Sequence, residues 1–272
     1  MRTNKIVCDT NIWYYVENGT IKLKDYDFKY PLSSTWLSLN ELFMTPLLYK
    51  DPELVFRVID TMFVNSKTIL IYPDDYIRGI CFGIDINNNQ LIHIEIKALI
   101  EFYKKAKVDF YSSLQEKPIF DAWIEYVNNF NLEQKKRANG VKEVENKMKE
   151  IASETNYKRR IYEDKDEIEK QHTNLISIRF YELFKNDDEL LPEYERQFKL
   201  YNSVKFQLIK RLTVTGLAHQ ENDFEDFDNL IYVNEGDLYW TEENRWLNLI
   251  KDSKMLKYLE SPKLNKKFSS VV

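Results

Sequence analysis

The most constraining feature of the sequence is a short apolar run that ends in an acid and leads directly into a helix. Residues 5–8 (KIVC) form the run and Asp9 ends it. Thr10 and Asn11 then supply helix-capping side chains before residues 12–15 (IWYY). In open α/β sheets, ligands bind at the carboxyl ends of the strands. Asp9 is therefore predicted to lie at a functional site.

Two further strand segments follow before residue 75. Residues 32–35 (LSST) are predicted to form a strand that leads into a helix over 37–48, and Glu41 falls on the first turns of that helix. Asp51-Pro52 starts another helix, because Asp is a good cap and Pro fits the first helical position. Residues 67–72 (KTILIY) are a candidate third strand.

The alternation of strand and helix returns near the end of the sequence. The segment 223–228 (DFEDFD) is an acidic helix start, and residues 238–240 (LYW) are a short strand. Glu242 or Glu243 lies just beyond that strand, where the first strand has Asp9. Helices are predicted over 203–217 and 245–259.

The sequence between these two groups of strands is long, charged and mostly helical in pattern. With only 6 Gly and 7 Pro, the chain has little material for the tight turns of a β-sandwich. We therefore predict an α/β core in two parts, residues 1–75 and 205–272, with a helical insertion over residues 76–204.

Composition excludes several functional classes. The net charge of −5 argues against a chain that binds nucleic acid over its whole surface. Local basic clusters would make phosphate contacts, although each also fits a solvated helix face: 135–137, 158–160 and 210–211. The three histidines show no metal-ligand spacing, and no Gly-rich phosphate loop is present. No apolar run spans a bilayer, which predicts a cytoplasmic chain with no membrane partner.

Taken together, the motifs resemble those of the PIN-domain ribonucleases. The resemblance rests on four segments, which occur in that family's order: Asp9-Thr10-Asn11, the stretch from Ser34 to Leu42, NDFEDFDNLIYV and DLYWTEENRWL. It covers about the first 75 and the last 70 residues. The implied fold is a three-layer α/β/α arrangement with a central parallel sheet, to which this chain adds the helical insertion.

The resemblance also assigns roles to individual residues. Its four acids match Asp9, Glu41, Asp226 and Glu243, with Thr10, Asn11 and Thr241 in support. Asp226 is preferred as the third acid because its distance to Thr241 is close to the family's usual gap, and Asp223 and Asp228 stay as alternatives. The fourth position departs from the family, which most often has Asp where this chain has Glu243.

The resemblance implies that the acids bind Mg²⁺ or Mn²⁺ and that the protein hydrolyses RNA. The insertion would then shape access to the RNA or bind an antitoxin or another protein partner, in a toxin or defence role. Two alternatives stay open. One is a PIN-like scaffold that binds RNA or protein without cutting, and the other is a structure-specific DNA nuclease.

Overall fold

The computed structural model describes residues 3–84, 94–108, 165–185, 187–211 and 223–260, together with single positions between 110 and 146. Within this part, one sheet has the strand order β3-β2-β1-β4. All three neighbouring pairs are parallel. The strands are β1 (Ile6–Cys8), β2 (Leu32–Thr35), β3 (Thr68–Leu70) and β4 (Leu238–Trp240). The predicted α/β class with a central parallel sheet is confirmed.

Helices cover the sheet, as parallel strands require, since each crossover must return the chain to the same edge. The first group comprises α1 (Thr10–Glu17), α2 (Trp36–Met44), α3 (Leu47–Lys50), α4 (Pro52–Asn65) and α6 (Ile94–Val108). The second comprises α5 (Pro73–Cys81), α10 (Lys165–Phe184), α11 (Leu191–Gln197), α12 (Lys199–Lys210), α13 (Asp223–Asp228) and α14 (Asn244–Asp252).

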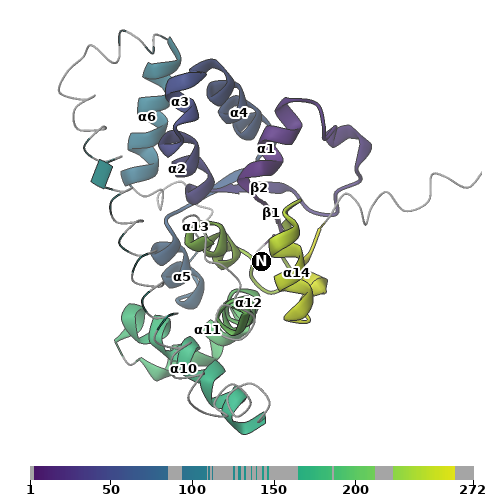
Figure 1. Ribbon diagram of the computed structural model, residues 1–272, viewed down its shortest axis with the longest axis vertical. Coiled ribbons are helices and arrows are strands. Elements are labelled where there is room, and N and C mark those ends of the chain that lie inside the picture. The colour runs from purple at the N-terminus through teal and green to yellow at the C-terminus, as the bar shows by residue number, and fades with distance from the viewer. Residues whose placement is uncertain are drawn as a thin grey trace, which may run out of the picture.

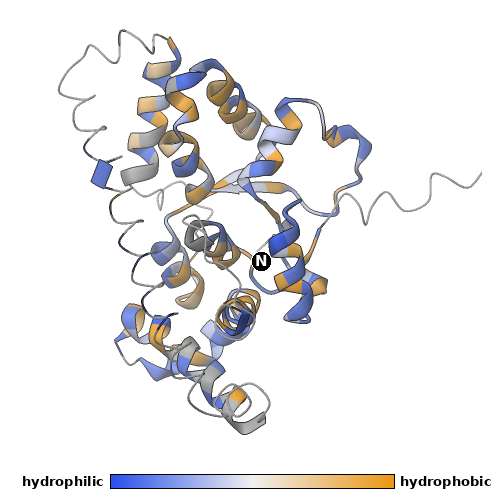
Figure 2. Cartoon of the chain, viewed as in Figure 1, coloured by the Kyte–Doolittle hydropathy of each residue, from blue (hydrophilic) through white to orange (hydrophobic). Residues whose placement is uncertain are grey.

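The two groups lie on different sides of the sheet. In Figure 1, α1, α2, α4 and α6 lie on one side and α5, α12, α13 and α14 on the other. This arrangement is compatible with three α/β/α layers. Figure 2 shows that hydrophobic residues concentrate where the helices face the sheet and one another. The largest fully buried side chains include Trp13, Trp240, Trp246, Tyr232 and Phe43.

Two predicted helices are shorter than the sequence pattern indicated. The helix expected over 37–48 ends at Met44, because Pro46 pushes Thr45 into an extended conformation with ψ 136°. A separate short helix, α3, follows. The helix expected over 245–259 ends at Asp252, since Lys254 adopts a left-handed conformation with φ 61°.

The start of α1 also corrects an expectation. Thr10 and Asn11 were the predicted caps, but the side chain of Asp9 is the N-cap and accepts a hydrogen bond from the Thr10 amide. Asp is among the best N-cap residues because its carboxylate satisfies an amide that has no partner inside the helix. By contrast, Asp51 caps α4 and Pro52 occupies its first position, as predicted.

The described parts of the predicted insertion pack on both halves of the core. On one side, Phe102 of α6 lies against Phe43 of α2, with ring centroids 5.6 Å apart. On the other, His172 of α10 lies against Phe206 of α12, with ring centroids 5.5 Å apart. The predicted boundary between residues 204 and 205 falls inside α12, which is continuous across it. Most of residues 109–164 lies outside the described part, so the three-part division stays a prediction.

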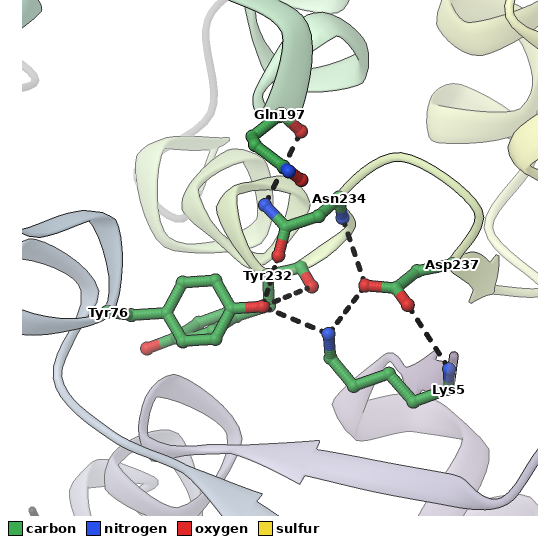
Figure 3. A network of polar contacts seen from close by, with 6 residues as sticks. All are labelled: Lys5, Tyr76, Gln197, Tyr232, Asn234 and Asp237. Atoms are coloured by element: carbon green, nitrogen blue, oxygen red, sulfur yellow. Dashed lines mark hydrogen bonds and ion pairs between the residues drawn. The ribbon is translucent and has the colours of Figure 1, made fainter. Parts of the chain in front are cut away.

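A buried polar network joins the amino-terminal ends of β1 and β4 (Figure 3). The Lys5 ammonium pairs with the Asp237 carboxylate at 2.5 Å, and the two residues are only 6% and 1% exposed. The same ammonium donates to the hydroxyl of Tyr76 in α5 at 2.9 Å. The backbone amide of Asn234 donates to the same carboxylate oxygen, Asp237 Oδ2, at 3.1 Å. The network therefore ties α5 and the turn before β4 to the start of β1.

The first prediction concerns this ion pair. Asp237→Ala leaves the Lys5 ammonium buried without its charge partner, and we expect the free energy of unfolding in urea to fall by about 3 to 5 kcal/mol. The control is Glu235→Ala, which breaks the pair between Glu235 and Arg196, whose side chains are 53% and 50% exposed. That exposed pair contributes little because solvent screens it. Equal losses in the two variants would contradict the prediction.

Candidate functional site

The pairing of β1 with β4 brings four of the predicted site residues into contact in two pairs, Asp9 with Thr241 and Asn11 with Glu243. The register aligns Val7 with Tyr239 and Cys8 with Trp240. Continued by one residue, the same register sets Asp9 opposite Thr241, and the Thr241 hydroxyl donates to Asp9 Oδ2 at 2.7 Å. Two residues further along, the Asn11 amide group donates to the carboxylate of Glu243. Both contacts join residues separated by 232 positions.

Asp9 is held on both carboxylate oxygens. The Thr10 amide donates to Oδ1 at 2.8 Å, while Thr241 donates to Oδ2. Thr241 in turn accepts from the amide of Glu243 at 3.2 Å. These bonds fix the rotamer of Asp9 and connect it to the loop that carries Glu243. The Thr10 backbone amide and the Thr241 hydroxyl thus bond to Asp9, and Asn11 bonds to Glu243. Their supporting role in a metal site stays a prediction.

The environment of Asp9 disfavours its negative charge. The residue is 2% exposed, and burial together with the charge of Glu243 raises its pKa to about 7. The charge of Glu41 acts in the same direction, whereas the hydrogen bond from Thr241 opposes it. A positively charged group nearby would therefore stabilise the ionised form of this buried carboxylate, which lies near two other carboxylates.

Glu41 reaches the same region from α2, the helix that directly follows β2. Thr35 ends β2 and caps α2, with its hydroxyl oxygen accepting from the Ser38 amide at 3.0 Å. This cap places Glu41 in the second turn of α2. Burial raises the pKa of Glu41, the Thr10 side chain lowers it and the charge of Glu243 raises it. Glu41 also contributes, after burial, to raising the pKa of Tyr14 in α1 to about 12.

Tyr239 in β4 shows how far the acidic group extends. Burial is the main reason that the pKa of its phenol lies well above the usual value. The next causes, all in the same direction, are the charges of Asp9, Asp226, Glu243 and Glu41, in decreasing order. All four acids that the sequence suggested therefore lie within electrostatic range of one hydroxyl group. Asp226 reaches this region from α13, on the opposite side of the sheet from α2 (Figure 1).

The alternative third acids are placed differently. Asp228 accepts a hydrogen bond from Tyr201 at 3.5 Å, and its charge acts on Lys205, whose pKa is lowered by burial. Its charge also acts on Tyr232 and on Arg179 of α10. The side chain of Asp223 lies outside the described residues. Asp226, in contrast, is second after Asp9 among the charges that raise the pKa of Tyr239, so Asp226 stays the preferred third acid.

The acids do not form a ready-made ligand cage. Among the residues that the structure describes, no three His, Cys, Asp or Glu side chains are grouped closely enough to hold a metal ion. The chemistry of the group nevertheless fits a hard divalent cation, which prefers carboxylate oxygens and would relieve their mutual repulsion. Asp9, Glu41, Asp226 and Glu243 are the residues that would hold it.

Two residues near the group were not found by sequence analysis. Thr35 donates from its hydroxyl to Asn229 Oδ1 at 2.7 Å, and Asn229 is buried directly after α13. This bond ties the end of β2 to the helix that carries Asp226. The other is Tyr239, which reads in sequence as one apolar residue of the strand 238–240. Only the position of Thr35 at a strand end could have drawn attention to the first contact.

The basic clusters receive only a partial test. Of the three clusters, 158–160 lies outside the described residues, as do Lys135 and Arg137. In the third, Arg211 forms an ion pair with Asp252 of α14. That pairing fits the surface interpretation of the cluster as well as it fits a phosphate contact.

Comparisons with protein-family models, with curated proteins and with solved structures find no match for this chain. In the part of the chain that the structure describes, no helix is both long enough and apolar enough to cross a membrane.

The second prediction follows from the raised pKa of Asp9. In the unfolded chain an Asp loses its proton at about pH 4, whereas the folded protein keeps the proton on Asp9 up to about pH 7. The folded state thus binds more protons in this window, so the free energy of unfolding falls as pH rises through it. The full effect is on the order of 4 kcal/mol at most.

Asp9→Asn removes this contribution and keeps the helix cap, because Asn is an equally good N-cap. In EDTA, we expect the variant to be more stable than the wild type at pH 8, with the difference shrinking toward pH 4. Urea unfolding at a series of pH values measures this. A difference that does not change with pH would show that Asp9 is not destabilised by its neighbours.

Proposed function

We propose that this protein is a metal-dependent endoribonuclease with a PIN-like core. The observation that carries the proposal is that the charges of Asp9, Glu41, Asp226 and Glu243 all act on the buried phenol of Tyr239, near the carboxyl ends of β1 and β4. Parallel sheets bind ligands at this edge. The choice of RNA as the substrate comes from the resemblance of the four acidic motifs to those of PIN-domain ribonucleases.

In this proposal Asp9 and Asp226 bind the cation directly, while Glu41 and Glu243 complete the site. A bound Mg²⁺ or Mn²⁺ would supply an activated water and would neutralise charge on the phosphodiester. The contribution of the chain is positional. Thr241 and the Thr10 amide fix Asp9, and Asn11 restrains Glu243, as ligands are commonly oriented by neighbours that hydrogen-bond to them.

The raised pKa of Asp9 makes cation binding depend on pH. A proton and a divalent cation compete for the same carboxylate, so the affinity for the cation rises as the solution pH approaches and passes about 7. Neighbouring carboxylates cause part of this shift. The repulsion that destabilises the metal-free protein is therefore the same repulsion that a cation would relieve.

The third prediction tests activity and site together. Wild-type protein is incubated with labelled RNAs and DNAs in Mn²⁺, in Mg²⁺ or in EDTA, beside the single variants Asp9→Asn and Asp226→Asn. We expect RNA to be cut only with a metal, and each variant to lose at least about 100-fold in rate, as expected when a group that stabilises charge in the transition state is removed.

Asp228→Asn is the matched control for Asp226→Asn. It makes the same chemical change on the same helix, at a residue that accepts a hydrogen bond from Tyr201 of α12. The control is expected to keep wild-type activity. If both variants lost activity equally, the assignment of the third acid would be refuted. Cutting of DNA in preference to RNA would favour the structure-specific DNA nuclease.

A second candidate function is a PIN-like scaffold that binds RNA or protein without cutting. One observation favours it: no described trio of acids is already arranged to hold a metal. RNA binding that survives EDTA, with no cutting in either metal, would support the scaffold. In both cases we propose the helical insertion, which includes α6, α10 and α11, as the surface for a protein partner such as an antitoxin.

A further inference from the structure

Tyr239 has a buried hydroxyl group without a hydrogen-bond partner among the described residues. The residue is in β4 and its side chain is fully buried. Two other fully buried tyrosines show the usual arrangement, since Tyr232 donates to the Ile71 carbonyl at 2.8 Å and Tyr76 contacts Lys5. A buried hydroxyl that makes no hydrogen bond loses its hydration without compensation. A hydroxyl buried at this place therefore calls for an explanation.

The position of Tyr239 on β4 directs it toward the acid group. Side chains two residues apart in a strand lie on the same face of the sheet, so Tyr239 shares a face with Thr241. Thr241 contacts Asp9 directly. Val7 is the register partner of Tyr239 on β1, two residues before Asp9. The charges of all four acids act on the phenol, with Asp9 first and Asp226 second.

We propose that Tyr239 is a positioning residue of the metal site, whose hydroxyl donates a hydrogen bond to a carboxylate oxygen of the acid group when a divalent cation is bound. This inference rests on the proposed function. Asp9 and Glu243 are already held by Thr241 and Asn11. Gathering the acids around a cation requires some of them to shift, because the described side chains do not form a cage. A donor already buried beside them would hold the gathered arrangement.

Tyr194 of α11 is a matched control for this inference. Its hydroxyl also lacks a described partner, and its side chain is also fully buried. Its electrostatic neighbours are different, however: Arg179, Cys81, Asp228 and Asp74. Tyr194→Phe and Tyr239→Phe therefore remove the same atom from equally buried sites, and only one of these sites adjoins the acid group.

The fourth prediction compares these two variants. Because each loses a hydroxyl without a described partner, both should keep or slightly exceed the wild-type melting temperature in EDTA. Mn²⁺ affinity, measured by calorimetric titration, should fall about tenfold in Tyr239→Phe, as expected for loss of a hydrogen bond to a charged group. Tyr194→Phe should bind Mn²⁺ as the wild type does.

Each other outcome has a definite meaning. Wild-type Mn²⁺ affinity in Tyr239→Phe overturns this inference and leaves the proposed function intact. A large drop in the melting temperature of Tyr239→Phe in EDTA also overturns it, since the hydroxyl would then serve the fold. An equal loss of affinity in both variants points to a general packing effect and likewise overturns it. Absence of Mn²⁺ binding by the wild type overturns both this inference and the metal-dependent function.

Discussion

The parallel register between β1 and β4 is the constraint on which both the fold and the candidate site depend. Three side-chain contacts repeat the same separation of 232 positions, Lys5 with Asp237, Asp9 with Thr241 and Asn11 with Glu243. The first lies before the paired strands and the other two lie after them. If one strand slipped by one residue, its side chains would point to the opposite face of the sheet and all three contacts would be lost.

The two ends of this strand pair differ in their balance of charge. At the amino-terminal end, a buried cation and a buried anion neutralise each other within a network that Tyr76 and Asn234 extend. At the carboxyl end, acids approach one another and the pKa of Asp9 rises to about 7. Ionisable groups that are strongly shifted by burial and like charge concentrate at functional sites. The ion pair between Lys5 and Asp237 stabilises the register of β1 and β4. That register in turn keeps the acids close together at the carboxyl end.

Much of the fold could be predicted from local patterns, because strands, caps and prolines have local causes. All four strands and the helix that begins at Pro52 follow from apolar runs and capping residues. The early end of α2 could have been read from Pro46, which restricts the residue before it. The sequence could prefer Asp226 over Asp228 only by its gap to Thr241, because both lie on one short helix and their neighbours depend on tertiary structure. Tyr239 was missed because its side chain is buried like any apolar residue, and its role depends on acids brought together from other elements.

We propose that these acids gather around a divalent cation. The most direct measurement is an anomalous difference map from crystals of the protein grown or soaked with Mn²⁺ near pH 8, where Asp9 is ionised. We expect a Mn²⁺ peak within bonding distance of the Asp9 and Asp226 carboxylates, with Glu41 and Glu243 beside it. A map with no peak at the carboxyl ends of β1 and β4, or with Mn²⁺ bound only elsewhere, would contradict it.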